Sequence, residues 1–230
     1  MPDTSVVVQV TSAIAAIGAL GTAASGLVDA TKAFWGGISN VGFSRIEEAL
    51  KPFSNALKNA ESDWSKTIRA SWINGTPKDD QKTAAKSLIR LGLSSANVKD
   101  MAVAGHVDET ELKDVLAAIE SGTALIPSQV NVLGRFNGAI DAALDGGFEQ
   151  ADQQYRNACK LCAGLFAVVL ALWGGWLLAP GEGGLITYLS GANAGRAILV
   201  GIIAVPLAPV AKDLTSSLQA AVTAMKAVSK

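Results

Sequence analysis

Charged side chains are nearly absent between residues 161 and 211, and this constrains the fold more than any other feature. Within that region only Glu182 and Arg196 carry a charge. Residues 161–181 form an uncharged run of 21, rich in Leu, Val, Phe and Trp. A helix needs about 20 such residues to cross a hydrocarbon core of about 30 Å. The run therefore predicts a transmembrane helix, and the alternative is a buried central helix of a soluble bundle.

A second uncharged run covers residues 197–211 and would measure about 22 Å as a helix. Arg196 and Lys212 flank it, and their long side chains can extend toward the membrane surface. Pro206 and Pro209 predict a kink. The helix-breaking cluster at residues 180–184 then turns the two runs into a helical hairpin. The alternative for the second run is a re-entrant or interfacial segment.

The N-terminal residues 4–28 are also uncharged, but most of them are Ala, Gly, Ser or Thr. Larger apolar residues recur there at helical spacing. They are Val6, Val10, Ile14, Ile17, Leu20, Leu27 and Val28. This segment predicts a helix that is a weak third membrane span, a helix lying on a surface, or a helix packed inside a bundle.

Flanking charges and aromatic residues predict the orientation. Positive charge concentrates on the cytoplasmic side of membrane proteins, and Trp gathers at the membrane–water interface. We therefore expect the main helical domain and the C-terminus on the cytoplasmic side. The residues expected at the membrane boundary are Arg156, Lys160, Arg196, Lys212, Trp173 and Trp176.

Between the apolar segments the pattern is that of short helices. Residues 44–72 place Ile46, Leu50, Trp64 and similar residues on one helical face. That face packs either on a core of this chain or in a coiled-coil seam with a second subunit. Further helices are expected at 77–91, 95–104, 109–121 and 127–144, and Asp108 with Glu111 gives the helix at 109–121 a capping-box-like start. The Asp145-Gly-Gly cluster should end the last of these, and a new helix should run over 148–178.

The predicted fold class is thus all-α: a membrane helical hairpin near the C-terminus, a cytoplasmic helical domain, and a possible third membrane helix. Four segments are expected. They are an apolar N-terminal helix (1–36), the cytoplasmic domain (37–147), a long helix leading into the hairpin (148–211) and an amphipathic tail (212–230).

Small residues recur along both predicted hairpin helices. Such strips let helix backbones approach closely in lipid, where packing drives association. They serve either the hairpin itself or an interface between subunits. The expected helix-packing or oligomer residues are Ala163, Ala167, Ala171, Gly174, Ala197, Gly201, Ala204 and Ala208.

Signals for catalysis are absent from the sequence. No phosphate-binding loop, dinucleotide fingerprint, zinc-protease motif or nucleophile elbow occurs. His106 is the one histidine and is expected in a turn. Cys159 and Cys162 fall inside a predicted helix, so they lack the helix N-terminus that would lower the pKa of a reactive thiol. A net charge of −1 argues against a nucleic-acid partner. We expect no catalytic residues, cofactor or metal, and no small-molecule ligand is indicated.

The expected function is that of a non-enzymatic membrane scaffold or assembly subunit, whose partners are the lipid bilayer and other copies or a membrane complex. The alternative is a pore-forming or membrane-disrupting effector with a cytoplasmic helical sensor domain. The marginal hydrophobicity of residues 4–28 motivates that alternative.

Overall fold

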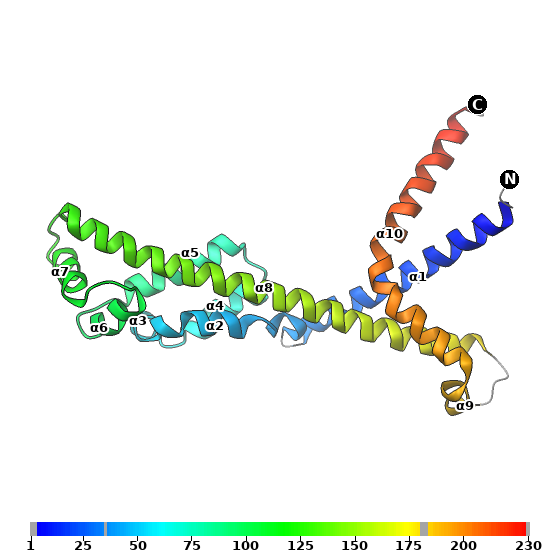
Figure 1. Ribbon diagram of the computed structural model, residues 1–230, viewed down its shortest axis with the longest axis horizontal. Helices are drawn as coiled ribbons and strands as arrows, with labels where there is room; N and C mark the ends of the chain where they lie inside the picture. The colour runs from blue at the N-terminus through cyan, green and yellow to red at the C-terminus, as the bar shows by residue number, and fades with distance from the viewer. Residues whose placement is uncertain (1–3, 35, 180–183, 229–230) are drawn as a thin grey trace. The chain divides into compact units, whose positions relative to one another are not determined.

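The computed structural model describes residues 4–34, 36–179 and 184–228. Over these residues the regular structure is helical, without a strand, which confirms the all-α prediction (Figure 1). The chain divides into two compact units, residues 39–155 and residues 1–38 with 156–230. The long helix α8 (Pro127–Leu178) contributes to both.

The unit of residues 39–155 is built from short helices and the first part of α8. Its elements are α2 (Phe43–Leu50), η3 (Lys51–Phe53), α3 (Ser54–Ala60), α4 (Trp64–Ile73), α5 (Lys78–Leu91), α6 (Val98–Ala104) and α7 (Glu109–Glu120). A further turn of 3-10 helix, η2 (Gly37–Asn40), lies at its beginning. Asp108 caps α7 as its sequence predicts, because its carboxylate accepts hydrogen bonds from the Thr110 and Glu111 amides.

One apolar core holds this unit together. Phe53 and Phe136 meet edge to face, with ring centroids 6.5 Å apart. Trp72 packs on Phe148 in the same manner and donates its indole N–H to the Ser39 carbonyl. The largest fully buried side chains of the core are Phe53, Phe136, Phe148, Ile46, Leu50, Leu57, Ile89, Met101, Leu112, Ile140 and Leu144.

The amphipathic face of residues 44–72 packs into this core, which confirms the first of its two interpretations. Ile46, Leu50 and Trp64 are buried there, so they are not available for a seam with a second subunit. The stretch is not one helix, since Pro52 lies in the 3-10 turn η3 and a second break separates α3 from α4 at residues 61–63.

The predicted break at Asp145-Gly-Gly is wrong, because α8 continues through it from Pro127 to Leu178. Gly147 is buried against α2, where an added β-carbon would lie 2.5 Å from the Ala49 β-carbon. The close approach of two helices thus requires a residue without a side chain at position 147. Packing, rather than a chain reversal, explains this glycine.

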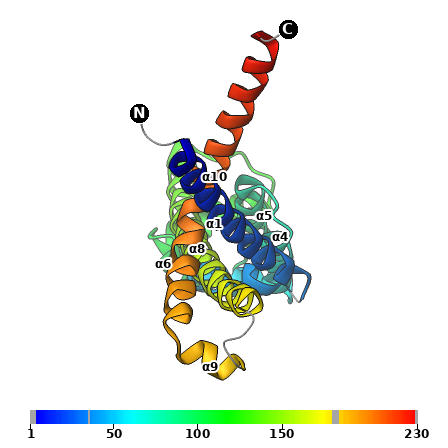
Figure 2. The ribbon, with the colours of Figure 1, turned by 90° about the vertical axis from the view of Figure 1, so that its right-hand side faces the viewer.

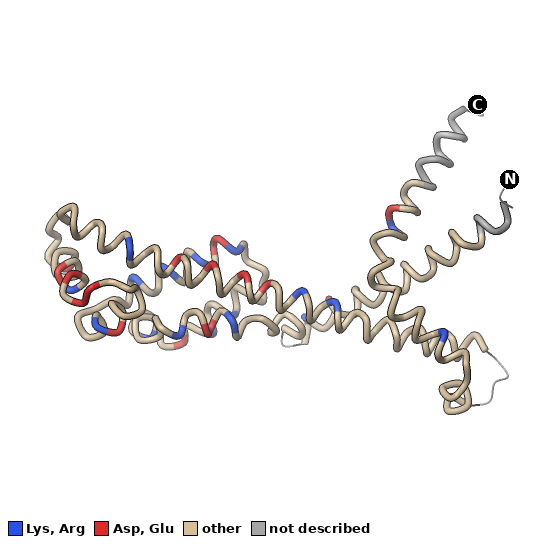
Figure 3. The backbone as a smooth tube through the Cα atoms, viewed as in Figure 1, with Lys and Arg blue, Asp and Glu red and all other residues tan. Residues whose placement is uncertain are grey.

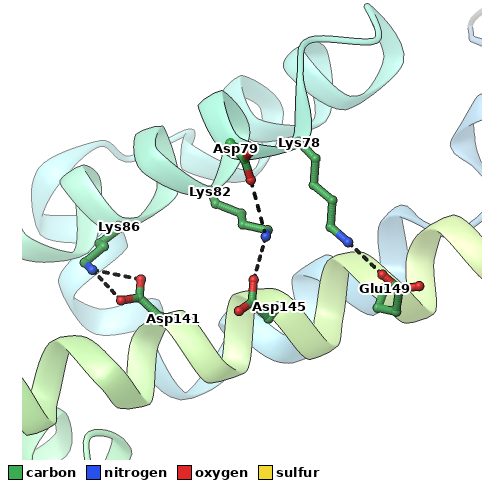
Figure 4. Close-up of polar contacts among 7 residues, drawn as sticks. All are labelled: Lys78, Asp79, Lys82, Lys86, Asp141, Asp145 and Glu149. Atoms are coloured by element: carbon green, nitrogen blue, oxygen red, sulfur yellow. Dashed lines mark hydrogen bonds and ion pairs between the residues drawn. The ribbon is translucent and has the colours of Figure 1, made fainter.

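Three lysines of α5 pair with three acidic residues of α8 in an ion-pair ladder (Figure 4). The pairs are Lys78–Glu149, Lys82–Asp145 and Lys86–Asp141, with N–O distances of 2.8, 2.5 and 2.6 Å. Both sets recur every four residues in opposite order, so the two helices run antiparallel. The hydrogen bond from Lys82 lowers the pKa of Asp145, and the same bond raises the pKa of Lys82.

The unit of residues 1–38 and 156–230 contains the long apolar helices (Figures 1 and 2). Its elements are α1 (Thr4–Ala30), η1 (Thr31–Ala33), the second part of α8, α9 (Leu185–Ser190) and α10 (Ala192–Val228). Three helices of the described chain are long and apolar enough to cross a membrane. They are Gln9–Ala33, Pro127–Leu178, whose apolar part belongs to this unit, and Ala192–Leu214. The breaker residues 180–183 lie outside the described residues.

Helix α10 continues from Ala192 to Val228, so the second apolar run and the predicted tail form one element. The helix contains Pro206 and Pro209 and changes direction along its length (Figure 1). A proline removes one backbone hydrogen bond and clashes with the preceding turn, which accounts for such a bend. The predicted kink is therefore present, within a longer helix than expected.

Candidate functional site: the apolar helices

The face of α1 that lies against α10 brings small residues into the closest contact, and Ile17 and Leu20 pack beside them. A β-carbon added at Gly18 would overlap the Ala211 side chain, and one added at Gly21 would overlap the Ala204 carbonyl. Ala24, one turn further along, is fully buried with Ala204. Because these residues have almost no side chain, the two backbones come into direct contact.

Helix α8 meets α10 through the predicted small-residue strips. A β-carbon at Gly201 would lie 2.5 Å from the Val168 α-carbon, and Ala167 is fully buried with Ala204 and Ala24. Of the eight predicted packing residues, four are buried: Ala163, Ala167, Gly201 and Ala204. The other four are half-buried: Ala171, Gly174, Ala197 and Ala208. Part of each strip thus packs inside the chain, while Gly174 has nothing within 4 Å of an added β-carbon.

Large apolar side chains point outward from the same helices. On α8 they recur every four residues along one exposed face: Leu161, Leu165, Val169, Trp173 and Leu177. On α10 the exposed set includes Leu199, Ile202, Ile203 and Val210. Leu165 and Trp173 each keep 61% of their surface exposed. This distribution is opposite to that of the residue 39–155 unit, where the large side chains are inside.

Charged residues are rare on these helices and common on the other unit (Figure 3). Of the predicted boundary residues, Arg156, Lys160, Arg196 and Lys212 are all exposed. Trp173 is exposed and Trp176 half-buried, both near the end of α8.

Hydroxyl groups on α1 make hydrogen bonds within their own helix. Thr22 Oγ1 donates to the Gly18 carbonyl and Ser25 Oγ to the Gly21 carbonyl, each at 3.0 Å. Bonds of this kind leave no unmet donor on an exposed side chain. These two hydroxyls are therefore satisfied within α1 itself.

Two hollows lie on these helices. An open groove of about 560 Å³ runs between α1 and α10, lined mainly by small residues such as Ala15, Ala19, Ala23 and Ala208. A second pocket, of about 330 Å³, lies where α9 meets α8 and α10, and its wall includes Tyr188, Asn193 and Arg196.

The residues considered for chemistry do not form a cluster. His106 is exposed in the turn between α6 and α7, as predicted, with the left-handed backbone angle φ of 52°. Cys159 and Cys162 are half-buried inside α8. Among the described residues there is no group of three side chains able to hold a metal ion.

The glycine face of α1 was not predicted. The predicted stripe of larger residues is correct in part: Val28 is buried, and Ile17 and Leu20 pack against Ala24 and Ala204. Two other members of the stripe are exposed, Val10 at 53% and Leu27 at 41%. Gly18, Gly21 and Ala24 recur at three-residue spacing, and that spacing was the available signal.

Comparison of the chain with protein-family models, with curated proteins and with solved structures found no match.

Proposed function

We propose that this chain is a non-enzymatic integral membrane scaffold or assembly subunit that self-associates through its apolar helices. The observation that carries the proposal is the inverted arrangement of α1, α8 and α10. The closest contacts between these helices are made by small residues, while many of their large apolar residues are exposed. In water an exposed apolar surface of this extent is unfavourable, whereas lipid covers it without cost.

In the proposed arrangement α1, the apolar part of α8 and the first part of α10 cross the bilayer. The hairpin of α8 and α10 turns on the outer side, and the unit of residues 39–155 lies in the cytoplasm with the C-terminus. Arg156, Lys160 and Lys212 support this orientation, because positive residues concentrate on the cytoplasmic side.

Membrane insertion is tested by washing membranes of cells that express the full chain with alkaline carbonate. We expect the chain to stay in the membrane pellet and to need detergent for release. A chain that is released and remains monodisperse without detergent would refute the proposal. Sidedness is tested with Lys99→Cys and Gly184→Cys in a chain whose native cysteines are Ser. An impermeant maleimide should label position 184 from outside and position 99 only after lysis.

Self-association is assigned to the groove between α1 and α10. Most of its lining residues are alanine or glycine, beside Thr22, Lys212 and Ser216, so the helix of a second copy can approach closely there. Ala19→Leu places a large side chain in the groove and should reduce the crosslinked dimer in membranes. Ala16→Leu adds the same side chain to an exposed position of α1 that does not line the groove, and it should leave the dimer unchanged.

Monomer alone in the crosslinked wild type would contradict self-association. Dye release from liposomes that contain the purified chain would contradict the scaffold proposal and favour the pore-forming alternative. Sealed vesicles at high protein load are the outcome that the scaffold proposal expects.

A further inference from the structure

The pocket at the junction of α8, α9 and α10 is lined by a hydroxyl group that makes no hydrogen bond to the described residues. Tyr188 on α9 is 1% exposed and lines the pocket. Its hydroxyl lies against Gly175 of α8, where an added β-carbon would overlap the hydroxyl oxygen. No hydrogen bond joins this hydroxyl to the residues that the structure describes. A tyrosine hydroxyl that lines a pocket and has no hydrogen bond to the described residues can donate one to a ligand with an accepting oxygen.

The same pocket carries positive charge from two sources. Arg196 lines it, and none of the acidic side chains described in the structure pairs with its guanidinium. Its Nη1 donates to Asn193 Oδ1 at 3.2 Å, which orients the guanidinium beside the pocket wall. The pocket also lies at the start of α10, whose first residue is Ala192. The N-terminus of a long helix attracts anions through its free amides and its dipole.

From these observations we propose that the pocket formed by Gly175, Tyr188, Asn193 and Arg196 binds the phosphodiester group of a membrane lipid. One phosphate oxygen accepts a hydrogen bond from the Tyr188 hydroxyl, and a second phosphate oxygen accepts a hydrogen bond from the Arg196 guanidinium. The walls formed by Ala171, Ala197 and Val200 are apolar and suit the glyceride part of the lipid. The proposal rests on membrane insertion as described above.

The lipid preference follows from the charges of the pocket. Because the described wall residues include a cation and no acid, a headgroup with net negative charge fits better than a zwitterionic one. The expected order of retention is phosphatidylglycerol, then phosphatidylcholine, then diacylglycerol, which lacks phosphate.

The test is native mass spectrometry of the full chain in a neutral detergent, after addition of each of these three lipids or of inorganic phosphate. We expect phosphatidylglycerol to remain bound. Arg196→Gln should weaken its binding about tenfold or more, because a charged hydrogen bond is lost. Tyr188→Phe keeps the buried ring and removes only the hydroxyl, and it should weaken binding about two- to tenfold.

Two controls accompany these variants. Lys160→Gln removes an exposed cation outside the pocket, and Tyr155→Phe removes a hydroxyl from the other unit, so both should bind lipid as the wild type does. Equal retention by the two pocket variants, or equal retention of diacylglycerol, would overturn the proposal. Displacement of the lipid by millimolar inorganic phosphate would show that the pocket binds free phosphate rather than a lipid headgroup, and would overturn the proposal.

The carbonate wash separates this proposal from the previous one. If the wild type and both pocket variants stay in the membrane pellet while lipid retention is unchanged, the site fails and the membrane scaffold stands. If the wild type itself is released from the membrane, the scaffold proposal fails.

Discussion

Lys82 Nζ lies 2.5 Å from Asp145 Oδ1 and also approaches Asp79 Oδ1 at 3.6 Å. The pair joins α5 to the middle of α8. The sequence pattern assigned its acidic member, Asp145, to the end of a helix. Asp145 therefore stabilises the antiparallel contact between two helices. Its neighbours in the ladder, Asp141 and Glu149, do the same one turn before and one turn after it (Figure 4).

The Lys82–Asp145 contact predicts a dependence of stability on pH. The pKa of Asp145 is lowered by the Lys82 hydrogen bond, so its contribution is present above the ordinary carboxyl pKa of about 3.9 and is lost as the pH falls through the lowered pKa. The pKa of Lys82 is raised by the Asp145 hydrogen bond, so its contribution is present below about pH 10.4 and is lost as the pH rises through the raised pKa.

Asp145→Asn should therefore lower the thermal midpoint of the detergent-solubilised chain at pH 7, and the difference from the wild type should disappear in strong acid. Tryptophan fluorescence during heating measures both midpoints. Asp114→Asn, an exposed carboxylate of α7 outside the ladder, should cause no such difference. A deficit of Asp145→Asn that stays the same size at every pH, from neutral into strong acid, would contradict the electrostatic explanation.

A charge exchange at Lys86 and Asp141 tests the ladder directly. Lys86 Nζ contacts both carboxylate oxygens, at 2.8 and 2.6 Å. Lys86→Glu or Asp141→Lys alone brings like charges together, while the double exchange restores an opposite pair. We expect a coupling free energy of about 0.2–1 kcal/mol from the double-mutant cycle, as for other pairs near the surface. Additive effects of the two changes would show that the pair contributes nothing.

The adjacent glycines of α8 should respond to alanine in opposite directions. Gly146 has no atom within 4 Å of an added β-carbon, so Gly146→Ala should stabilise the chain by about 0.5–1 kcal/mol through helix propensity. Gly147→Ala forces its new methyl group against Ala49 and should destabilise by about 1–3 kcal/mol. Denaturant unfolding measured by circular dichroism compares them. Equal stabilisation by both would refute the tight contact between α2 and α8.

On α1 we expect a corresponding contrast between Gly21 and Gly26. Gly21→Val collides with the Ala204 backbone and should separate α1 from α10, whereas Gly26→Val enters open space. The readout is disulfide formation in membranes between Thr22→Cys and Ala208→Cys, two residues that line the same groove, in a chain without native cysteines. Unchanged disulfide yield in Gly21→Val would contradict the packing of these helices.

Much of the helical structure could be predicted because it depends on local signals. Apolar spacing identified the buried face of residues 44–72. Asp108 marked the start of α7, because its carboxylate accepts hydrogen bonds from the first backbone amides of that helix. The three candidate membrane helices followed from uncharged length alone. These properties belong to single segments, so no knowledge of neighbouring helices was needed.

The errors arose where a distant contact decides the local structure. Gly147 is a turn signal in isolation, and only the position of Ala49 shows why a helix retains it. Hydrophobic periodicity selects large apolar residues. It therefore identified Ile17, Leu20 and Val28 correctly, but it also selected the exposed Val10 and Leu27 and missed the close contacts of Gly18, Gly21 and Ala24. The pocket at Tyr188 depends on three helices and has no signature in any one of them.

The contact between α1 and α10 has a consequence for the order in which this unit assembles. α1 precedes α10 in the chain, so it is synthesised well before the segment of α10 that carries Ala204 and Ala211. Glycine and alanine have no rotamers to immobilise, so late docking of α10 on α1 costs no side-chain freedom at Gly18, Gly21 and Ala24. The small residues at this contact therefore let two segments far apart in the sequence pack together after both have been synthesised.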